Sequence, residues 1–107
     1  NIHLPEGCNS VNFRALYEDK IFPKLNNFAP DLLLLSSGFD AHRCDPLAPI
    51  NLETTDYGWL TTELCKIADT HANGRLVSIL EGGYHLDALK ESVDAHLRAM
   101  MQDCIDT

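Results

Sequence analysis

Two short polar segments hold the residues whose types and spacing could do chemistry. The first, residues 36–47, contains His42 and Asp45, three positions apart. The second, residues 81–85, places Tyr84 directly after two glycines. Carboxylates and histidines are ligands of metals such as zinc, and a tyrosine hydroxyl can donate a hydrogen bond to negative charge that develops during a reaction. The two segments together are therefore candidates for a metal-assisted site.

The polar residues of the first segment also have structural interpretations. Asp45 directly precedes Pro46 and could cap a turn there instead of binding a metal. His42 could share a metal with Asp45 only if the segment were helical, and the bracketing Gly38 and Pro46 make a helix unfavourable. For Asp40 we favour a hydrogen bond to the loop backbone, which is the usual role of Asp in tight turns.

The second segment is open to two interpretations as well. Gly82 and Gly83 allow a sharp turn with positive φ, and they would also let a substrate approach the backbone closely. Tyr84 is either a core residue or a donor to developing negative charge. His85 has no clear role from its position. The other histidines lie away from both segments, and we expect them at the surface: His3, His71 and His96.

The apolar residues predict five elements in the order α-β-α-β-α. Apolar residues that recur at helical spacing predict helices at residues 11–28, 54–72 and 86–101. Ser10 is the expected N-cap of the first helix, and Pro23 is expected to kink or break it. Strands are predicted at residues 31–36 and 76–80, the first being a run of the kind that is buried on both faces of a parallel sheet. The inward face of the last helix is predicted to consist of Leu89, Val93, Leu97 and Met100 or Met101.

These elements determine where the polar segments should lie. Strands joined by a helical crossover are normally parallel, so both strands should end at the same edge of the sheet. Ligands bind beyond this edge in open parallel α/β sheets, and both polar segments follow it. Sheets usually have about four to six strands, so two strands indicate a piece of a larger sheet. The predicted fold class is α/β, part of a three-layer α/β/α parallel sheet.

Composition and charge narrow the class of protein. The chain of 107 residues has a formal net charge of −8, which argues against nucleic acid as a direct partner because phosphate binding depends on clustered cations. The same charge is compatible with a cationic substrate such as a lysine-rich peptide or a polyamine. No apolar run approaches the ~18 residues needed to span a bilayer, so we expect no membrane partner. The oligomeric state is not indicated.

The cysteines and the first residue suggest the setting of the chain. Four cysteines occur at wide, irregular spacing and no signal peptide precedes them, which favours reduced thiols and a cytoplasmic location. The chain begins at Asn1 instead of Met, and we expect it to be a fragment or a processed chain.

The two polar segments together resemble the arginase/deacetylase-fold amidohydrolases, the superfamily of histone deacetylases, acetylpolyamine amidohydrolases and acetoin-utilisation proteins. The form of the first segment looks most like class II histone deacetylases and their bacterial relatives. The similarity covers essentially the whole chain, and it is carried by Ser37-Gly38-Phe39-Asp40-Ala41-His42-Arg43, by Asp45-Pro46-Leu47 and by Leu80-Glu81-Gly82-Gly83-Tyr84.

The resemblance implies roles for five residues. Asp45 matches the carboxylate zinc ligand that lies late in the family's chain. Tyr84 matches the tyrosine that hydrogen-bonds the scissile amide oxygen and its oxyanion. Gly82 and Gly83 match glycines that line the tunnel for the acylated lysine, and Leu52 matches an apolar residue of the tunnel wall.

The activity implied is that of a zinc-dependent deacylase, which hydrolyses the amide of an acetylated lysine peptide, a polyamine or another small acylated substrate. The family holds zinc with two Asp and one His. Its Asp-x-His ligand pair and tandem histidines lie upstream of the region matched here, and no Asp-x-His segment of this sequence is followed by paired histidines. Residues 1–107 are therefore expected to be the C-terminal portion of a single catalytic domain, inactive alone. The alternative is a non-catalytic deacetylase-like domain that binds acylated ligands or protein partners; the presence of Asp45 and Tyr84 argues against it.

Overall fold

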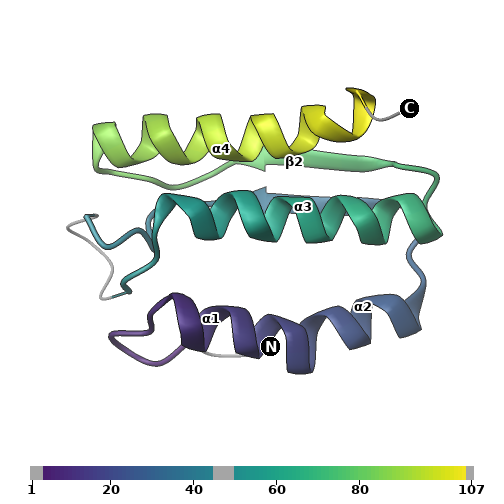
Figure 1. Ribbon diagram of the computed structural model, residues 1–107, viewed down its shortest axis with the longest axis horizontal. Coiled ribbons are helices and arrows are strands. Elements are labelled where there is room, and N and C mark those ends of the chain that lie inside the picture. The colour runs from purple at the N-terminus through teal and green to yellow at the C-terminus, as the bar shows by residue number, and fades with distance from the viewer. Residues whose placement is uncertain (1–3, 45–49, 106–107) are drawn as a thin grey trace.

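The computed structural model describes residues 4–44 and 50–105 (Figure 1). The order of elements is the predicted one, except that the first helical region is divided into three parts. No helix in the described ranges combines the length and apolarity needed to cross a membrane. The elements are α1 Ser10–Leu16, the π-helical turn η1 Tyr17–Ile21, α2 Phe22–Phe28, β1 Leu33–Ser37, α3 Thr54–His71, β2 Leu76–Leu80 and α4 Leu86–Ile105.

The first helical region is interrupted just ahead of Pro23. The proline lies in the first turn of α2, directly after the π-helical turn, where the regular backbone pairing that a proline cannot join is already interrupted. In η1 a backbone hydrogen bond spans five residues instead of the four of an α-helix: the N–H of Phe22 donates to the carbonyl of Tyr17. The predicted N-cap, Ser10, is wrong by one residue. The side chain of Asn9 caps α1 instead, because the Ser10 hydroxyl donates to a carboxylate of α3.

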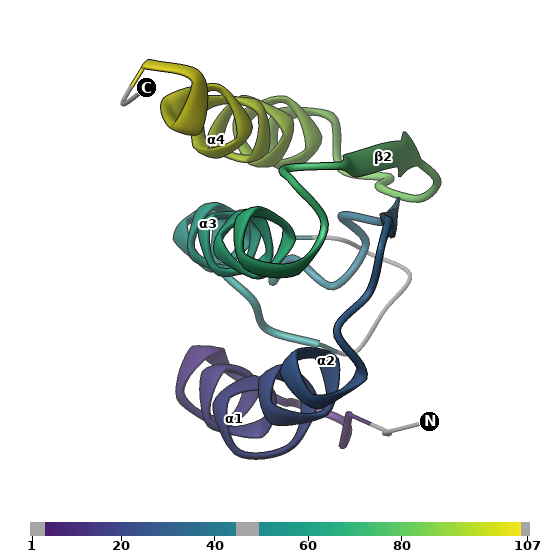
Figure 2. The same ribbon diagram turned by 90° about the vertical axis from the view of Figure 1, so that its right-hand side faces the viewer.

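Strands β1 and β2 form a parallel pair, with Leu33 beside Leu76 and Ser37 beside Leu80. Figure 2 shows that α3 and α4 lie on one side of the strands. On the opposite face Leu34 is 65% exposed and Ile79 is 56% exposed. The prediction that the first strand is buried on both faces is therefore wrong for this chain: the described residues form one helical layer against one face of the sheet.

Helix α4 contacts α3 mainly through small side chains. Ala88, Ser92 and Ala99 are buried, and a Cβ added to Gly58 of α3 would lie 3.7 Å from the Cβ of Ala95. Small residues let the two helices approach closely, and this turns part of the predicted apolar face outward. The prediction that Leu97 points inward is wrong, since it is 49% exposed.

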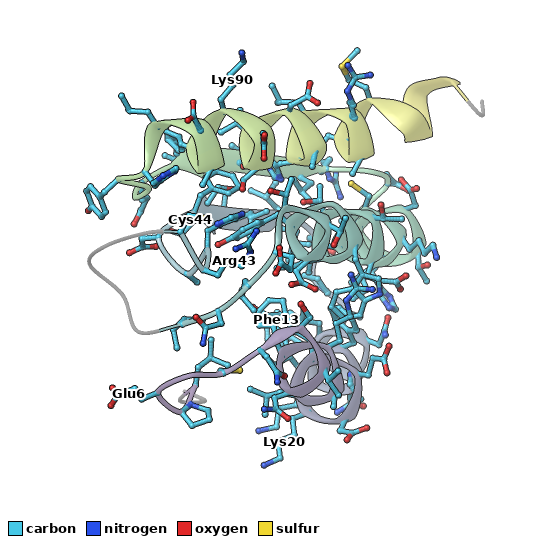
Figure 3. The ribbon with its side chains drawn as sticks, turned by 60° about the vertical axis from the view of Figure 1, so that its left-hand side comes forward. Glu6, Phe13, Lys20, Arg43, Cys44 and Lys90 are labelled. Carbon is cyan, nitrogen blue, oxygen red and sulfur yellow. The ribbon has the colours of Figure 1, made fainter. Side chains whose placement is uncertain are left out.

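The core between the first helices and α3 is aromatic. Phe13 is 4% exposed and points from α1 toward the rest of the molecule, whereas Lys20 points away from it (Figure 3). Burial raises the pKa of the neighbouring Tyr17. The rings in contact are Phe13 with Tyr17 at 4.7 Å, Tyr17 with Phe22 at 5.5 Å and Phe22 with Trp59 at 5.6 Å between centroids.

One buried carboxylate ties α1 to α3. Asp56 is fully buried and accepts hydrogen bonds from the Arg14 Nε at 2.9 Å, from the backbone N–H of Glu53 at 2.8 Å and from the Ser10 hydroxyl. The bond to Glu53 is half of a capping box that begins α3. A nearby thiol, Cys8, has its pKa raised by burial and by the negative charge of Asp56. Asp56 therefore fixes both the start of α3 and the position of α1.

We predict that Asp56→Asn lowers the free energy of unfolding by about 2 kcal/mol, because an amide cannot accept all three hydrogen bonds and loses the charge that attracts Arg14. The matched control is Asp94→Asn, which breaks an exposed pair with Arg98 on α4 and should cost less than about 0.5 kcal/mol. Urea denaturation followed by circular dichroism measures both. Equal costs in the two variants would contradict a special role for Asp56.

Candidate active site

The two polar segments meet at one edge of the sheet, as the sequence predicts. We call residues 38–44 the β1 loop and residues 81–85 the β2 loop. Both strand arrows end on the same side of the molecule, where the two loops leave them (Figure 1). The N–H of Phe39 donates to the carbonyl of Gly82 at 2.8 Å, and the N–H of Glu81 donates to the carbonyl of Ser37 at 2.9 Å. The backbone pairing therefore continues past the strands into the loops.

The β1 loop is anchored in the core by Phe39. Its ring is 4% exposed and lies 5.0 Å from the ring of Tyr57 and 5.8 Å from the ring of His96. Farther along the loop, the backbone pairs with Leu52, which donates to the carbonyl of Ala41 and accepts from the N–H of Arg43. The loop is thus held at both ends.

The glycines of the site leave room for the side chain of Asp40. A Cβ on Gly82 would lie 3.2 Å from the Asp40 Cγ, and one on Gly38 would lie 3.1 Å from its Oδ1. The carboxylate therefore packs against backbone from both loops, which is consistent with a structural role for Asp40.

Gly83 fixes the direction in which the chain leaves the β2 loop. Its φ of +142° belongs to a region that residues with a side chain rarely adopt. A Cβ there would lie 2.7 Å from the Leu89 Cδ1 and 3.3 Å from the Phe39 Cβ. The next residue, Tyr84, is 55% exposed. The interpretation of Tyr84 as a core residue is therefore wrong for the described part of the chain, and Tyr84 directly follows the turn at Gly83.

Two histidines near the site have structural roles. The Nδ1 of His42 accepts from the N–H of Cys44 at 3.1 Å, so its proton is on Nε2, which lies 3.1 Å from the Thr54 hydroxyl. Both ring nitrogens are engaged, and neither is available to a metal. His85, which had no role from its position, caps α4, because its Nδ1 accepts from the N–H of Ala88 at 3.1 Å.

In the described part of the chain, the ion pair at the site is the exposed one between Arg43 and Glu53. Figure 3 shows Arg43 and Cys44 on the β1 loop between the layers of α4 and α1. The Arg43 Nε donates to the side chain of Glu53 at 2.9 Å, and this hydrogen bond raises the Arg43 pKa. Both side chains are about half exposed, so the pair adds little to stability.

The predicted metal ligand, Asp45, lies outside the described residues. Within residues 4–44 and 50–101 no group of three His, Cys, Asp or Glu side chains could hold a metal ion. The residues present thus do not make a three-ligand zinc site, and no catalytic step through a metal follows from them. Leu52 is 1% exposed and borders a cavity of about 140 Å³, whose lining does not include Gly82, Gly83 or Tyr84.

A buried polar network behind the loops was missed in the sequence. The prediction that His96 lies at the surface is wrong, since it is 5% exposed. Its Nδ1 lies 2.7 Å from the Thr61 hydroxyl and its Nε2 lies 2.8 Å from the Ser78 hydroxyl, which in turn bonds the hydroxyl of Ser37. The network links both strands to α3 and α4. The signal that could have found it is the i, i+4 spacing of His96 with the small residues Ala88 and Ser92.

The direction of each hydrogen bond in the network follows from the bond that Thr61 donates and from the neutral state of the His96 ring. The Thr61 hydroxyl donates to the carbonyl of Tyr57 at 2.7 Å, so it accepts from the His96 Nδ1. Burial lowers the pKa of His96, so its ring is neutral at pH 7 and its Nε2 accepts from Ser78. Ser78 must then accept from Ser37. The protons all point from β1 toward α3.

Comparison with known proteins gives one family. A sequence model described as the histone deacetylase domain matches residues 1–100. The chain is 48% identical over 103 residues to type-2 histone deacetylase 1 of Dictyostelium discoideum, covering 96% of this chain and 7% of the relative. It is 39% identical over 101 residues to the chloroplastic histone deacetylase 14 of Arabidopsis thaliana, covering 94% and 24%. A histone deacetylase-like amidohydrolase of Pseudomonas aeruginosa is 38% identical, over 76% of this chain and 21% of the relative.

The solved structures agree. The HD domain of HDA15 superposes with a TM-score of 0.82 at 28% identity, covering 92% of this chain and 27% of that one. The histone deacetylase Clr3 gives the same TM-score at 26% identity, covering 92% and 16%. The predicted arginase/deacetylase-like α/β fold is therefore confirmed. The chain spans less than a third of the length of each of these relatives and structures.

We predict that Gly83→Ala destabilises the protein by about 2 kcal/mol or more, because the added methyl group meets Leu89 and the φ of +142° strains any residue with a Cβ. Gly7→Ala is the matched control: Gly7 also has positive φ, +78°, but a Cβ there meets nothing within 4 Å. Its cost should be about 1 kcal/mol. Chemical denaturation compares the two, and a smaller cost at Gly83 than at Gly7 would contradict the packing argument.

We also predict that His96 makes stability depend on pH. Its pKa is lowered in the folded chain, so the unfolded chain binds the proton more readily. The contribution should be complete above the ordinary histidine pKa of about 6.5 and should decline as the pH falls below it. Urea midpoints measured between about pH 5 and 8 test this. The decline should be smaller in His96→Gln and unchanged in His71→Gln, which alters a histidine at the exposed end of α3.

Proposed function

The chain belongs to the histone deacetylase family, and we propose that its residues 1–107 are the C-terminal portion of a single deacylase domain. Its relatives are deacetylases or deacetylase-like amidohydrolases, so the chemistry of the family is the hydrolysis of an amide. We propose the same reaction for the full protein, with this chain supplying one wall of its active site.

One observation supports this proposal most. The hydrogen bond between the Phe39 N–H and the Gly82 carbonyl holds the two loops together at the sheet edge. The turn at Gly83 then brings Tyr84 to the surface of that edge. The β1 loop ends at Cys44, and Asp45 follows it directly in the sequence. The proposed reaction needs a carboxylate ligand and a hydroxyl donor on the two loops of one site. The sequence positions of Asp45 and Tyr84 meet this requirement.

In the proposed reaction, the Tyr84 hydroxyl donates a hydrogen bond to the oxygen of the scissile amide. Negative charge develops on this oxygen as the carbonyl carbon becomes tetrahedral, and a donor fixed in place stabilises that charge more in the transition state than in the substrate. We propose zinc as the cofactor, with Asp45 as one ligand. The remaining ligands and the histidine base would come from other residues of the full protein, because the described residues hold no cluster of three side chains that could bind a metal.

The glycines and Leu52 would contribute to the tunnel for the acyl group in different ways. We propose that Gly82 and Gly83, both partly exposed and without side chains, let an acylated chain pass close to the backbone. The side chain of Leu52 is in the core, and its backbone holds Ala41 and Arg43 in the β1 loop. Leu52 would therefore support the wall from behind.

The charge of the chain supports a cationic substrate. We propose an acetylated lysine peptide, an acetylated polyamine or another small acylated molecule, since a net charge of −8 attracts cations and repels nucleic acid. Cys8 and Cys44 are thiols, which is compatible with the reducing conditions of the cytoplasm, the proposed location.

We predict that Tyr84→Phe lowers kcat about 10²–10³-fold, the usual cost of one lost oxyanion donor, with little change in KM. The measurement is acetate release from an acetylated lysine peptide and from an acetylpolyamine by the full-length protein. Tyr17→Phe is the control, since it removes a tyrosine hydroxyl from η1 and from neither loop, and should leave kcat within about twofold.

Two other results would contradict the proposal. Undiminished turnover in Tyr84→Phe would remove Tyr84 from the mechanism. Saturable binding of the acetylated peptide with no acetate release from the wild type would instead support the non-catalytic alternative.

A further inference from the structure

We propose that His96 is a positioning residue of the active-site edge: its neutral ring, through the hydroxyls of Ser78 and Ser37, holds the ends of β1 and β2 in the arrangement that places Tyr84. The effect on turnover rests on the proposed function, whereas the effect on the two loops does not. His96 lies on α4, away from Tyr84 in sequence, and it acts through other residues.

The first step of the argument is the position of Ser37. It is the last residue of β1, and its hydroxyl is the end of the network that starts at His96. Its carbonyl accepts from the N–H of Glu81, the first residue of the β2 loop. One residue therefore joins the network through its hydroxyl and holds the second loop through its carbonyl. A shift of its backbone would move both loops.

The second step is a packing contact. The ring of His96 lies 5.8 Å from the ring of Phe39, at an angle of 66° between the planes. Phe39 is the residue whose N–H donates to the Gly82 carbonyl. The imidazole thus supports the hydrogen bond that joins the two loops by direct contact, in addition to the route through the hydroxyls.

The third step concerns the proton on the ring. If the Nε2 took up a proton it would donate to Ser78, and the Ser78 hydroxyl would lose the acceptor of its own proton. Either the Ser78 proton or, if Ser78 turns to donate to Ser37, the Ser37 proton would then need a new acceptor at the strand ends. A cavity of about 140 Å³, bordered by Ser37, Thr61 and His96, has room for water molecules that could hydrate the charge. Protonation would therefore loosen the strand end.

In the described part of the chain, the side chains that bond the ring or its partners, or stack on them, carry no formal charge. Burial is the cause of the lowered pKa of His96. Of the described residues that bond or stack against the ring and its partners, only Tyr57 is titratable. These residues are Ser37 of β1, Ser78 of β2, Tyr57 and Thr61 of α3 and Phe39 of the β1 loop.

The test uses the full-length protein and two substitutions of His96. His96→Gln keeps one donor and one acceptor and does not titrate, whereas His96→Leu fills the space with neither. Hydrogen exchange of the backbone N–H groups of Phe39 and Glu81 reports the pairing of the loops directly. Acetate release measured between about pH 5 and 8 reports the consequence for the site.

We predict that His96→Leu speeds exchange at both N–H groups about tenfold and lowers kcat about tenfold at pH 7.5, with KM within about twofold. His96→Gln should restore both quantities to within about threefold and should weaken the acid-side loss of kcat relative to wild type. Ser78→Ala breaks the network without altering the ring and should speed exchange as His96→Leu does, so it replaces His96→Leu if that variant fails to fold. His71→Gln should change neither quantity.

The remaining outcomes overturn the proposal. Unchanged exchange in both His96→Leu and Ser78→Ala would show that the network does not position the loops. A loss that His96→Gln does not repair would assign His96 a packing role alone. If the wild type releases no acetate, the proposed function fails, and the exchange measurement still decides the role of His96.

Discussion

The site depends on one constraint, the parallel pairing of β1 and β2. Two strands that run in the same direction and are joined through α3 must end at the same edge, so the chain that follows each of them is brought to one place. The pairing also continues beyond the strands through the bonds of Phe39 and Glu81. Every feature of the candidate site is therefore attached to a backbone ladder, and the position of Tyr84 is a consequence of strand direction, with the loop sequence making the local turn.

The β1 loop is in addition secured by side chains that pack beneath it and against the β2 loop. Phe39 is buried against Tyr57, and the space beside Asp40 exists because Gly38 and Gly82 have no side chain. Next to the β1 loop, whose His42 bonds Thr54 at the start of α3, Asp56 holds α1 against α3. The candidate catalytic residues can then lie at the surface of the sheet edge, because the packed layer beneath them makes the site rigid.

The sequence predicted the parts of the structure that depend on topology, and it missed those that depend on packing. The meeting of the two loops and the break near Pro23 follow from strand direction and from the missing N–H of proline. The burial of His96 does not follow, because the apolar period of α4 pointed to Leu97, whereas small side chains decide which face of the helix approaches α3. The exposed face of the sheet was missed for a related reason: a leucine-rich strand looks the same whether or not a second layer covers it. The metal-ligand role of Asp45, which lies outside the described residues, stays a prediction.

The strand β1 and its surroundings also bear on how reliably the chain folds. Residues 32–37 read Leu-Leu-Leu-Leu-Ser-Ser, so a misaligned strand would present nearly the same side chains to the helices as the native one. The residues just past the run break this degeneracy. A slip of one residue in one direction would put Gly38 where Phe39 packs and would leave a hole in the core; a slip in the other would put Gly38 where Ser37 stands, leaving the hydroxyl of Ser78 without its donor. An unmet buried hydrogen bond costs about 1–3 kcal/mol, enough to make the misaligned form rare. The polar network therefore also helps to select a single register for a strand of repetitive sequence.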